Sequence, residues 1–358
     1  MRATRVAAIG IIGTVALVAA ACGEAPKGAD AVKKDFKGCM VTDVGGIDDK
    51  SFNTSAWAGM KDAEKKQPHI EVDYKSSASS KDYEPNLKAY LKNDCDVIVA
   101  VGGLMFNALQ KVAKDNPDQQ FAIVDANMSM AKNVESMEFN TAEPSFLAGY
   151  TAAASSKSGK VATFGGQKID PVTIYMDGFA QGVDYYNKAK HKNVKLLGWD
   201  AKSQKGAFTG DFQDATGGKK QAETFVSQGA DVIFPVAGQA GVGGLSVTQD
   251  KANKGKVKAI WVDVDGCKSA KKYCDDFLTT SEKHIADAVS NVLINARDNK
   301  GKVTNTRTVG TLDNKGVGLA AFGDGVDSKV QDEVNKLKQD IIDGKIKITS
   351  KAQPEPVK

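Results

Sequence analysis

Four residues stand directly after strand-like apolar runs, where polar groups can reach a ligand: Asp43, Asp125, Gly238 and Asp265. A single aspartate in such a position commonly caps a helix or forms a turn. In parallel sheets, however, the carboxyl ends of the strands border one cleft, so four such positions from both halves of the chain are expected to converge. Carboxylates there can accept hydrogen bonds from hydroxyl groups, as when an acidic side chain holds a ribose diol.

Three phenylalanines lie close to these positions in the sequence. Phe52 belongs to the same loop as Asp43, whereas Phe212 and Phe234 lie in the second half of the chain. One aromatic ring from each half can sandwich a flat base when two lobes close on it. Phe234 lies inside a strand-like run and fits a core position equally well, so the sequence leaves the second stacking residue open.

The sequence contains no recognisable catalytic motif. We find no nucleophile elbow, no His-Glu-x-x-His helix and no EF-hand loop. The Gly-rich run 238–244 lacks both Gly-x-Gly-x-x-Gly and the P-loop ending, so a sugar contact suits it better than a phosphate. Asp48 and Asp49 resemble the acidic cluster of a nucleoside hydrolase, which makes hydrolysis the main enzymatic alternative. We expect a protein that is not an enzyme, with no catalytic residues, no metal and no cofactor.

The elements that position these residues alternate between strand and helix. Predicted strands cover residues 40–42, 70–74, 97–101, 121–125, 160–164, 194–199, 232–237, 257–262 and 317–321, with 134–140 a strand or a crossover. Predicted helices cover residues 55–66, 83–93, 106–116, 146–156, 175–190, 217–228, 284–299 and 326–342. Repeated βαβ units imply parallel sheets with helices on both faces, and two rounds of them imply two lobes with a cleft between.

The N-terminus has the pattern of a lipoprotein signal peptide. Arg2 and Arg5 precede an apolar stretch over 6–18 that ends in Ala19-Ala-Ala-Cys22. The stretch is shorter than the roughly 20 residues that a transmembrane helix needs. We expect a signal peptide over 1–21, a lipid on Cys22 and a flexible tether over 22–36. The alternative is an ordinary secretory signal with an incidental cysteine.

Charge and cysteine content agree with an exported small-molecule binder. The chain has 48 basic and 44 acidic residues, and removal of Arg2 and Arg5 leaves a net charge of only +2, which gives no electrostatic case for nucleic acid. Besides Cys22 there are four cysteines, an even number that suggests two disulfides in an extracytoplasmic protein. Adjacent parallel strands would join Cys39 to Cys95, and a short Lys-rich loop would join Cys267 to Cys274. A metal site is the alternative, but the spacing is not that of a zinc ligand set.

The run Val41-Thr-Asp-Val-Gly-Gly-Ile-Asp-Asp-Lys-Ser-Phe-Asn-Thr-Ser-Ala-Trp57 closely resembles the signature of the basic membrane protein family of lipoproteins, the purine-nucleoside-binding subunits of ABC importers. Four further segments support the resemblance in family order: 145–153, 177–182, 236–243 and 278–283. The resemblance implies a class I periplasmic-binding-protein fold, in which two Rossmann-like lobes with parallel sheets are joined by a three-stranded hinge. We place lobe 1 at 37–145 plus 283–310, and lobe 2 at 146–282 plus 311–350.

The resemblance also implies roles for individual residues. Asp43 and Asp125 would bind the base edge, Phe52 with Phe212 or Phe234 would stack on the base, and Gly238, Asp265 and Lys283 would hold the ribose. The implied protein is a monomer, lipid-anchored on the extracytoplasmic face of a bacterial cell membrane, that delivers a purine nucleoside to an ABC permease and its ATPase. The alternatives are a binding protein for a sugar or another small polar ligand, and a nucleoside-sensing surface receptor.

Overall fold

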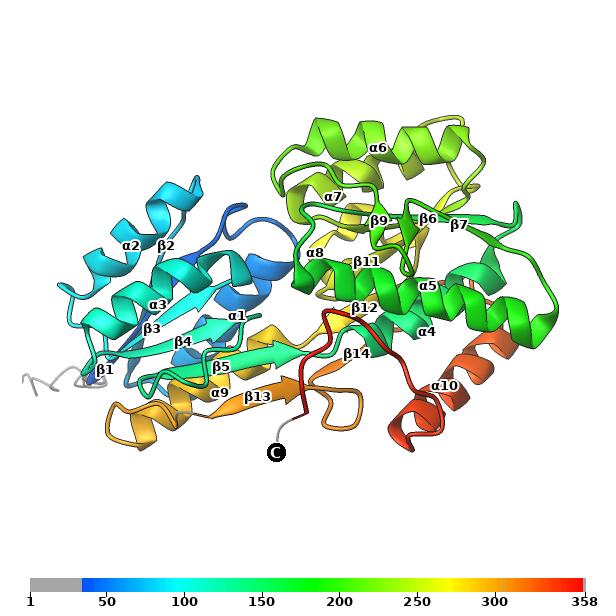
Figure 1. Ribbon diagram of the computed structural model, residues 1–358. Coiled ribbons are helices and arrows are strands. Elements are labelled where there is room, and N and C mark those ends of the chain that lie inside the picture. Colours follow the sequence, from blue (N-terminus) through cyan, green and yellow to red (C-terminus); the bar gives the residue numbers. More distant parts are fainter. Residues whose placement is uncertain (1–33, 305, 357–358) are drawn as a thin grey trace, which may run out of the picture. The chain divides into compact units, whose positions relative to one another are not determined.

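The computed structural model describes residues 34–304 and 306–356. The predicted signal peptide 1–21, the lipidation site Cys22 and the tether as far as residue 33 lie outside the described residues. The described chain folds around two six-stranded sheets, with one additional two-stranded sheet (Figure 1).

The first sheet is parallel throughout, with strand order β13-β5-β4-β3-β1-β2. Its strands are β1 (Phe36–Thr42), β2 (Ile70–Lys75), β3 (Val97–Val101), β4 (Gln120–Val124), β5 (Val134–Phe139) and β13 (Arg307–Gly310). All five residues of β3 are apolar and buried, as expected for a parallel strand that is covered on both faces. The strand order reverses between β1 and β3, which is where sheets of this kind bind ligands.

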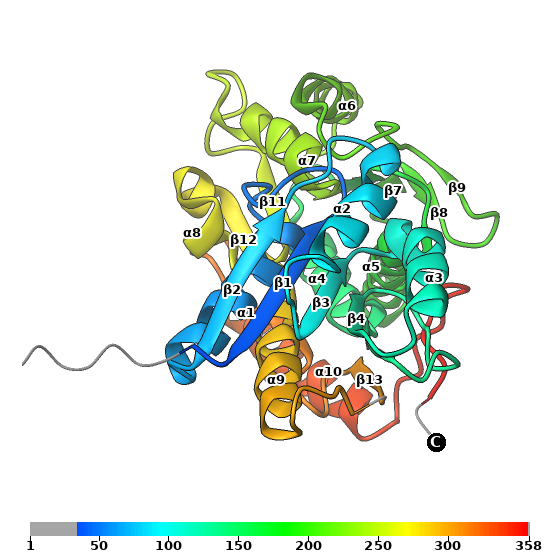
Figure 2. The ribbon, with the colours of Figure 1, turned by 90° about the vertical axis from the view of Figure 1, so that its left-hand side faces the viewer.

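Helices cover both faces of the first sheet (Figure 2). α1 (Phe52–Lys66) packs against α9 (Ile285–Asp298) on one face, while α2 (Tyr83–Tyr90) packs against α3 (Phe106–Asp115) on the other. Met40 belongs to the apolar cluster beneath α1 and α9, and its neighbour Val41 belongs to the cluster beneath α2 and α3. Successive side chains of a strand point to opposite faces, so β1 contributes to both cores.

The second sheet repeats this arrangement with strand order β14-β12-β11-β10-β6-β7. Its strands are β6 (Lys160–Gly165), β7 (Lys195–Leu197), β10 (Val232–Val236), β11 (Lys258–Asp263), β12 (Phe277–Lys283) and β14 (Val317–Leu319), of which only β14 is antiparallel to its neighbour. Its helices are α4 (Ala142–Ser155), α5 (Asp170–Lys190), α6 (Ala215–Ser227), α7 (Gly238–Leu245), α8 (Gly266–Ser269) and α10 (Ser328–Ile342). The small hairpin pairs β8 (Trp199–Asp200) with β9 (Lys205–Gly206).

The chain passes three times between the two sheets. It leaves the first sheet after β5, returns after β12 through α9 to β13, and leaves again after β13 to form β14. The predicted α/β fold with two parallel-sheet lobes and three crossings is therefore confirmed. Here "first lobe" means the first sheet with its helices, and "second lobe" means the second sheet with its helices.

Two local predictions are wrong. The Gly-rich run 238–244, which the sequence suggests is a turn after the strand 232–237, forms most of the helix α7. Its glycines let α7 approach α6: a Cβ on Gly243 would lie 1.9 Å from the carbonyl oxygen of Ala215. The predicted strand 194–199 is split into β7 and β8 at Gly198, whose φ of +86° turns the backbone close to Thr163. Left-handed backbone of this kind favours glycine.

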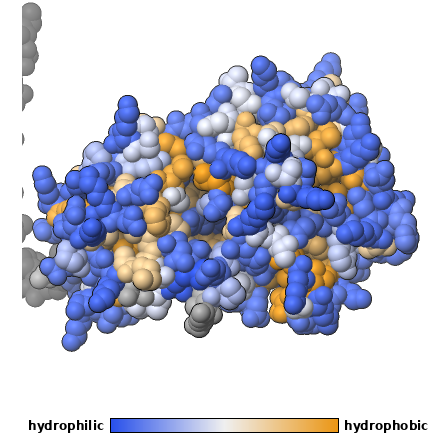
Figure 3. Space-filling view, viewed as in Figure 1, coloured by the Kyte–Doolittle hydropathy of each residue, from blue (hydrophilic) through white to orange (hydrophobic). Residues whose placement is uncertain are grey.

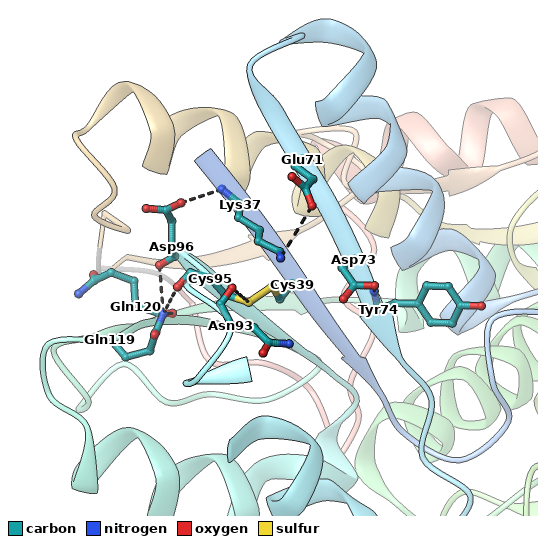
Figure 4. The surroundings of a disulfide bond; sticks show 10 residues. All are labelled: Lys37, Cys39, Glu71, Asp73, Tyr74, Asn93, Cys95, Asp96, Gln119 and Gln120. Atoms are coloured by element: carbon teal, nitrogen blue, oxygen red, sulfur yellow. Dashed lines mark hydrogen bonds and ion pairs between the residues drawn. A yellow bond between two sulfur atoms is a disulfide. The ribbon is translucent and has the colours of Figure 1, made fainter. Parts of the chain in front are cut away.

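Both predicted disulfides are present. Cys39 of β1 joins Cys95, which lies two residues before the start of β3, with 5.9 Å between their Cα atoms (Figure 4). Cys267 joins Cys274 across the loop that contains α8, with 4.6 Å between Cα atoms. Cys39 is fully buried, whereas Cys267 is exposed. The first bridge lies inside the first lobe, and the second lies at the surface of the second lobe.

Among the described residues, none of the helices combines the length and the apolar character that crossing a membrane requires. The face seen in Figure 3 is covered largely by hydrophilic residues.

Candidate functional site

The carboxyl ends of the strands in both sheets line one cavity. The first lobe contributes the loop after β1, the turn after β3 and Asp125 after β4, while the second lobe contributes the start of α5, the β10–α7 junction and the ends of β11 and β12. A cavity at this edge of both sheets is the expected ligand site of an open α/β fold.

The structure brings six of the eight predicted ligand-binding residues to this cavity: Asp43, Phe52, Asp125, Phe212, Gly238 and Lys283. Asp43, Asp125, Gly238 and Lys283 lie at the carboxyl ends of strands, Phe52 begins α1, and Phe212 lies between β9 and α6. The cavity wall does not include Phe234 or Asp265.

Phe234 is a core residue of the second lobe and not a cavity residue. Its side chain is fully buried, and its ring stacks on Phe179 with 4.8 Å between centroids. Two aromatic side chains of the second lobe line the cavity, Phe212 and Tyr175. A Cβ on Gly166 would lie 2.4 Å from the Phe212 ring, so a glycine at 166 gives this ring its space. Of the two phenylalanines, Phe212 therefore lines the cavity and Phe234 does not.

Asp265 lies two residues beyond the cavity and caps the short helix α8. Its carboxylate accepts a hydrogen bond from the backbone N–H of Cys267 at 3.0 Å and pairs with the exposed Lys268 at 3.3 Å. The carboxylate on the cavity wall is that of Asp263, the last residue of β11, which has a φ of +64°. The predicted strand ended at residue 262, and the turn at Asp263 directs the chain away before residue 265.

A buried ion pair connects the two lobes at the base of the cavity. The Lys283 ammonium lies 2.6 Å from a carboxylate oxygen of Asp125 and 3.8 Å from one of Asp263, and all three side chains are less than a tenth exposed. The Tyr175 hydroxyl donates a hydrogen bond of 2.6 Å to Asp263. Burial raises the pKa of both Asp125 and Asp263, and the Lys283 charge opposes that rise. Lys283 also lies 5.0 Å from the Phe52 ring centroid, a cation–π distance.

Asp43 is hydrogen-bonded by a neighbouring amide. The Asn53 side chain donates to its carboxyl group at 2.9 Å. Burial raises the pKa of Asp43 to about 8, with the Asn53 hydrogen bond opposing the rise and the nearby Asp49 and Asp125 adding to it. Burial thus favours the protonated form of this carboxyl, which can donate a hydrogen bond to a ligand acceptor.

Sequence reasoning missed several cavity residues, notably Asp49, Asn53 and Tyr175. The Asn53 Oδ1 atom is buried and has no hydrogen-bond partner among the described residues, so it is available to a ligand. Asn53 and Asp49 belong to the same acidic Gly-rich run as Asp43, and that shared run was the signal that could have pointed to them.

The structure gives no support to a catalytic acidic pair at Asp48 and Asp49. Asp48 is exposed, whereas Asp49 is buried and accepts hydrogen bonds from the backbone N–H groups of Ser51, Asn53 and Thr54. In the described part of the chain, no three His, Cys, Asp or Glu side chains are grouped so that they could hold a metal ion.

Comparison with known proteins identifies the family of this chain. Residues 36–352 match a family described as "ABC transporter substrate-binding protein PnrA-like". The chain is 33% identical to the "CD4+ T-cell-stimulating antigen" of Listeria innocua, over 96% of this chain and 98% of that protein. It is 31% identical to the "ABC transporter nucleoside-binding protein BmpA" of Lactococcus lactis, over 98% and 99%. A solved ABC transporter solute-binding protein from Aeropyrum pernix superimposes with a TM-score of 0.78 at 26% identity, covering 88% and 94%.

Proposed function

Since the chain belongs to the family of PnrA-like ABC transporter substrate-binding proteins, and is therefore a solute-binding protein and not an enzyme, we propose that it captures purine nucleosides in its interlobe cavity and delivers them to an ABC permease. The observation that carries this proposal is the composition of the cavity wall. The first lobe contributes the aromatic side chain of Phe52 and the second lobe contributes those of Phe212 and Tyr175, and the wall between them carries buried carboxylates. Aromatic faces suit a purine ring, and carboxylates suit hydroxyl and amine donors.

The charge of the cavity favours a nucleoside over a nucleotide. Four aspartates line it, Asp43, Asp49, Asp125 and Asp263, against a single lysine, Lys283. Even with Asp43 protonated, the carboxylates outnumber the cation, so a phosphate would meet repulsion at short range in a poorly solvated site. The same carboxylates can accept hydrogen bonds from a ribose diol. In this proposal Asp263 and Lys283 hold the sugar, while Asp43 and Asn53 meet the base edge.

Calorimetry tests the proposed ligand class. Titration with adenosine, guanosine and inosine is expected to give heat of binding, while ribose and inosine monophosphate give none. The base supplies the stacking surface that ribose lacks, and the phosphate meets the excess of carboxylates. Binding of ribose or an amino acid without any nucleoside signal would show that the site serves another polar ligand. Mass spectrometry of the small molecules released on denaturation provides an independent identification.

We further propose that a lipid on Cys22 holds the protein at the extracytoplasmic face of the membrane. The signal-like sequence over 1–22 and the two disulfides support this location, because disulfides persist in oxidising compartments. Labelling cells with a radioactive fatty acid is expected to mark the wild-type protein and not Cys22→Ala. Equal labelling of both proteins, or of neither, would contradict lipidation at Cys22.

A further inference from the structure

A hydrogen bond joins the two lobes directly, next to the cavity. The indole N–H of Trp261, in the middle of β11, donates to the backbone carbonyl oxygen of Lys50 at 3.1 Å, although the residues are 211 positions apart in the chain. Trp261 belongs to the second lobe and Lys50 to the loop after β1 in the first lobe. The contact uses no ligand atom and no side-chain atom of Lys50.

The acceptor side of this bond is held rigidly. The Asp49 carboxylate accepts hydrogen bonds from the backbone N–H groups of Ser51, Asn53 and Thr54, at 2.9 to 3.0 Å. Lys50 itself has a φ of +61°, a left-handed conformation that the surrounding loop maintains. These interactions fix the direction of the Lys50 carbonyl group. They also fix the start of α1, where Phe52 enters the cavity wall.

The donor side is equally constrained. The Trp261 side chain is fully buried, and a Cβ on Gly241 would lie 3.3 Å from its ring. Phe277 lies on another side, with 6.4 Å between ring centroids. A side chain confined in this way cannot follow the Lys50 loop if the lobes move apart. Separation of the lobes must therefore break the Trp261–Lys50 hydrogen bond.

Since both lobes form the walls of the cavity, we expect a ligand of nucleoside size to enter and leave as the lobes separate. We propose that Trp261 is a positioning residue that latches the Lys50 loop, and with it Phe52, against the second lobe and thereby slows ligand release. The claim that Trp261 slows ligand release rests on the proposed function, whereas the claim that it holds the lobes together is independent of the ligand.

The chain offers a matched control for this latch. Trp199 also donates its indole N–H to an oxygen acceptor, the Asp177 carboxylate at 2.9 Å, and is also buried. Both of these residues belong to the second lobe. Trp261→Phe and Trp199→Phe each keep an aromatic ring and delete one indole hydrogen bond, but only the first deletion removes a contact between lobes.

Stopped-flow displacement of inosine measures the release rate of each protein. A single neutral hydrogen bond corresponds to a change of about 2- to 12-fold in rate, so Trp261→Phe is expected to release inosine about 2- to 12-fold faster than wild type. Trp199→Phe is expected to lower the melting temperature and leave the release rate unchanged. An unchanged release rate in Trp261→Phe, or equal acceleration in both variants, would overturn the latch.

A second measurement without nucleoside separates failure of the latch from failure of the proposed function. Spin labels on Lys114→Cys of α3 and Lys220→Cys of α6, two exposed positions in different lobes, report the interlobe distance by pulsed electron paramagnetic resonance. Trp261→Phe is expected to increase the population with longer distances, relative to wild type and Trp199→Phe. Identical distance distributions in all three proteins would overturn the latch whatever the ligand proves to be.

Discussion

Replacing Lys283 by methionine is expected to lower the free energy of unfolding by about 3–5 kcal/mol at pH 7.5, because it leaves buried carboxylates without their cation. Lys283 lies 2.6 Å from Asp125 and 3.8 Å from Asp263, and its side chain is 3% exposed. Methionine keeps the length of the aliphatic chain, so the loss reports the charge. Urea denaturation followed by circular dichroism measures the effect.

The loss of unfolding free energy in Lys283→Met should depend on pH in a defined direction. Burial raises the pKa of Asp125 and Asp263 in the folded protein, and removal of Lys283 raises it further. A carboxyl with a raised folded-state pKa contributes its full stability below its unfolded-state pKa and loses it as pH rises through the folded-state pKa. The deficit is therefore expected to be smaller at pH 4.5 than at pH 7.5.

Lys345→Met is the matched control for Lys283→Met. Lys345 also lies near two carboxylates, Asp340 at 3.1 Å and Asp343 at 2.7 Å, but its side chain is 63% exposed. Exposed ion pairs contribute little because water screens them, so this variant should unfold at nearly the wild-type urea concentration. Equal urea midpoints for the two variants, or a deficit of Lys283→Met that does not change with pH, would show that the buried charges do not interact as described.

Asp263→Asn is expected to weaken inosine binding about 100-fold or more, under the proposal that its carboxylate holds the ribose diol. Hydrogen bonds to a charged group contribute about 1.5–3 kcal/mol each, and a diol can donate two. Asparagine keeps the size of the side chain and can still accept from Tyr175, which donates to Asp263 at 2.6 Å. Binding of 2′,3′-dideoxyinosine, which has no diol, should change far less.

Asp265→Asn is the matched control for Asp263→Asn. Asp265 caps α8 by accepting from the Cys267 N–H group, and asparagine is as good an N-cap as aspartate. Calorimetry of this variant should therefore give wild-type affinity for inosine. Two outcomes would contradict the assignment of the sugar site to Asp263. One is a loss of inosine affinity in Asp265→Asn that is as large as in Asp263→Asn. The other is an equal loss of affinity for inosine and for dideoxyinosine in Asp263→Asn.

Local sequence patterns predicted the two α/β lobes but not every strand. Buried parallel strands such as β3 appear as short apolar runs with amphipathic helices between them, so the two lobes followed from periodicity. The three crossings were implied by the family resemblance, and the pattern did not predict β12 or β13. Asp43 and Asp125 were found for the same reason, because they directly follow strands whose ends are clear in the sequence. The cysteine pairs followed from strand adjacency and from a short loop.

The residues that only the tertiary structure decided are those whose positions depend on contacts between distant segments. Whether Asp263 or Asp265 reaches the cavity depends on the residue at which the backbone turns at the end of β11. Moving this turn by two residues leaves the apolar pattern of the strand unchanged, so the pattern does not locate the turn. The sequence left open whether Phe212 or Phe234 reaches the cavity, but the packing of Phe234 on Phe179 places Phe234 in the core. The Trp261–Lys50 bond joins residues 211 positions apart. The periodicity of the sequence shows which face of a helix or strand is apolar. Which residue reaches the cavity depends instead on packing against side chains of other elements, and that packing forms only when the whole chain has folded.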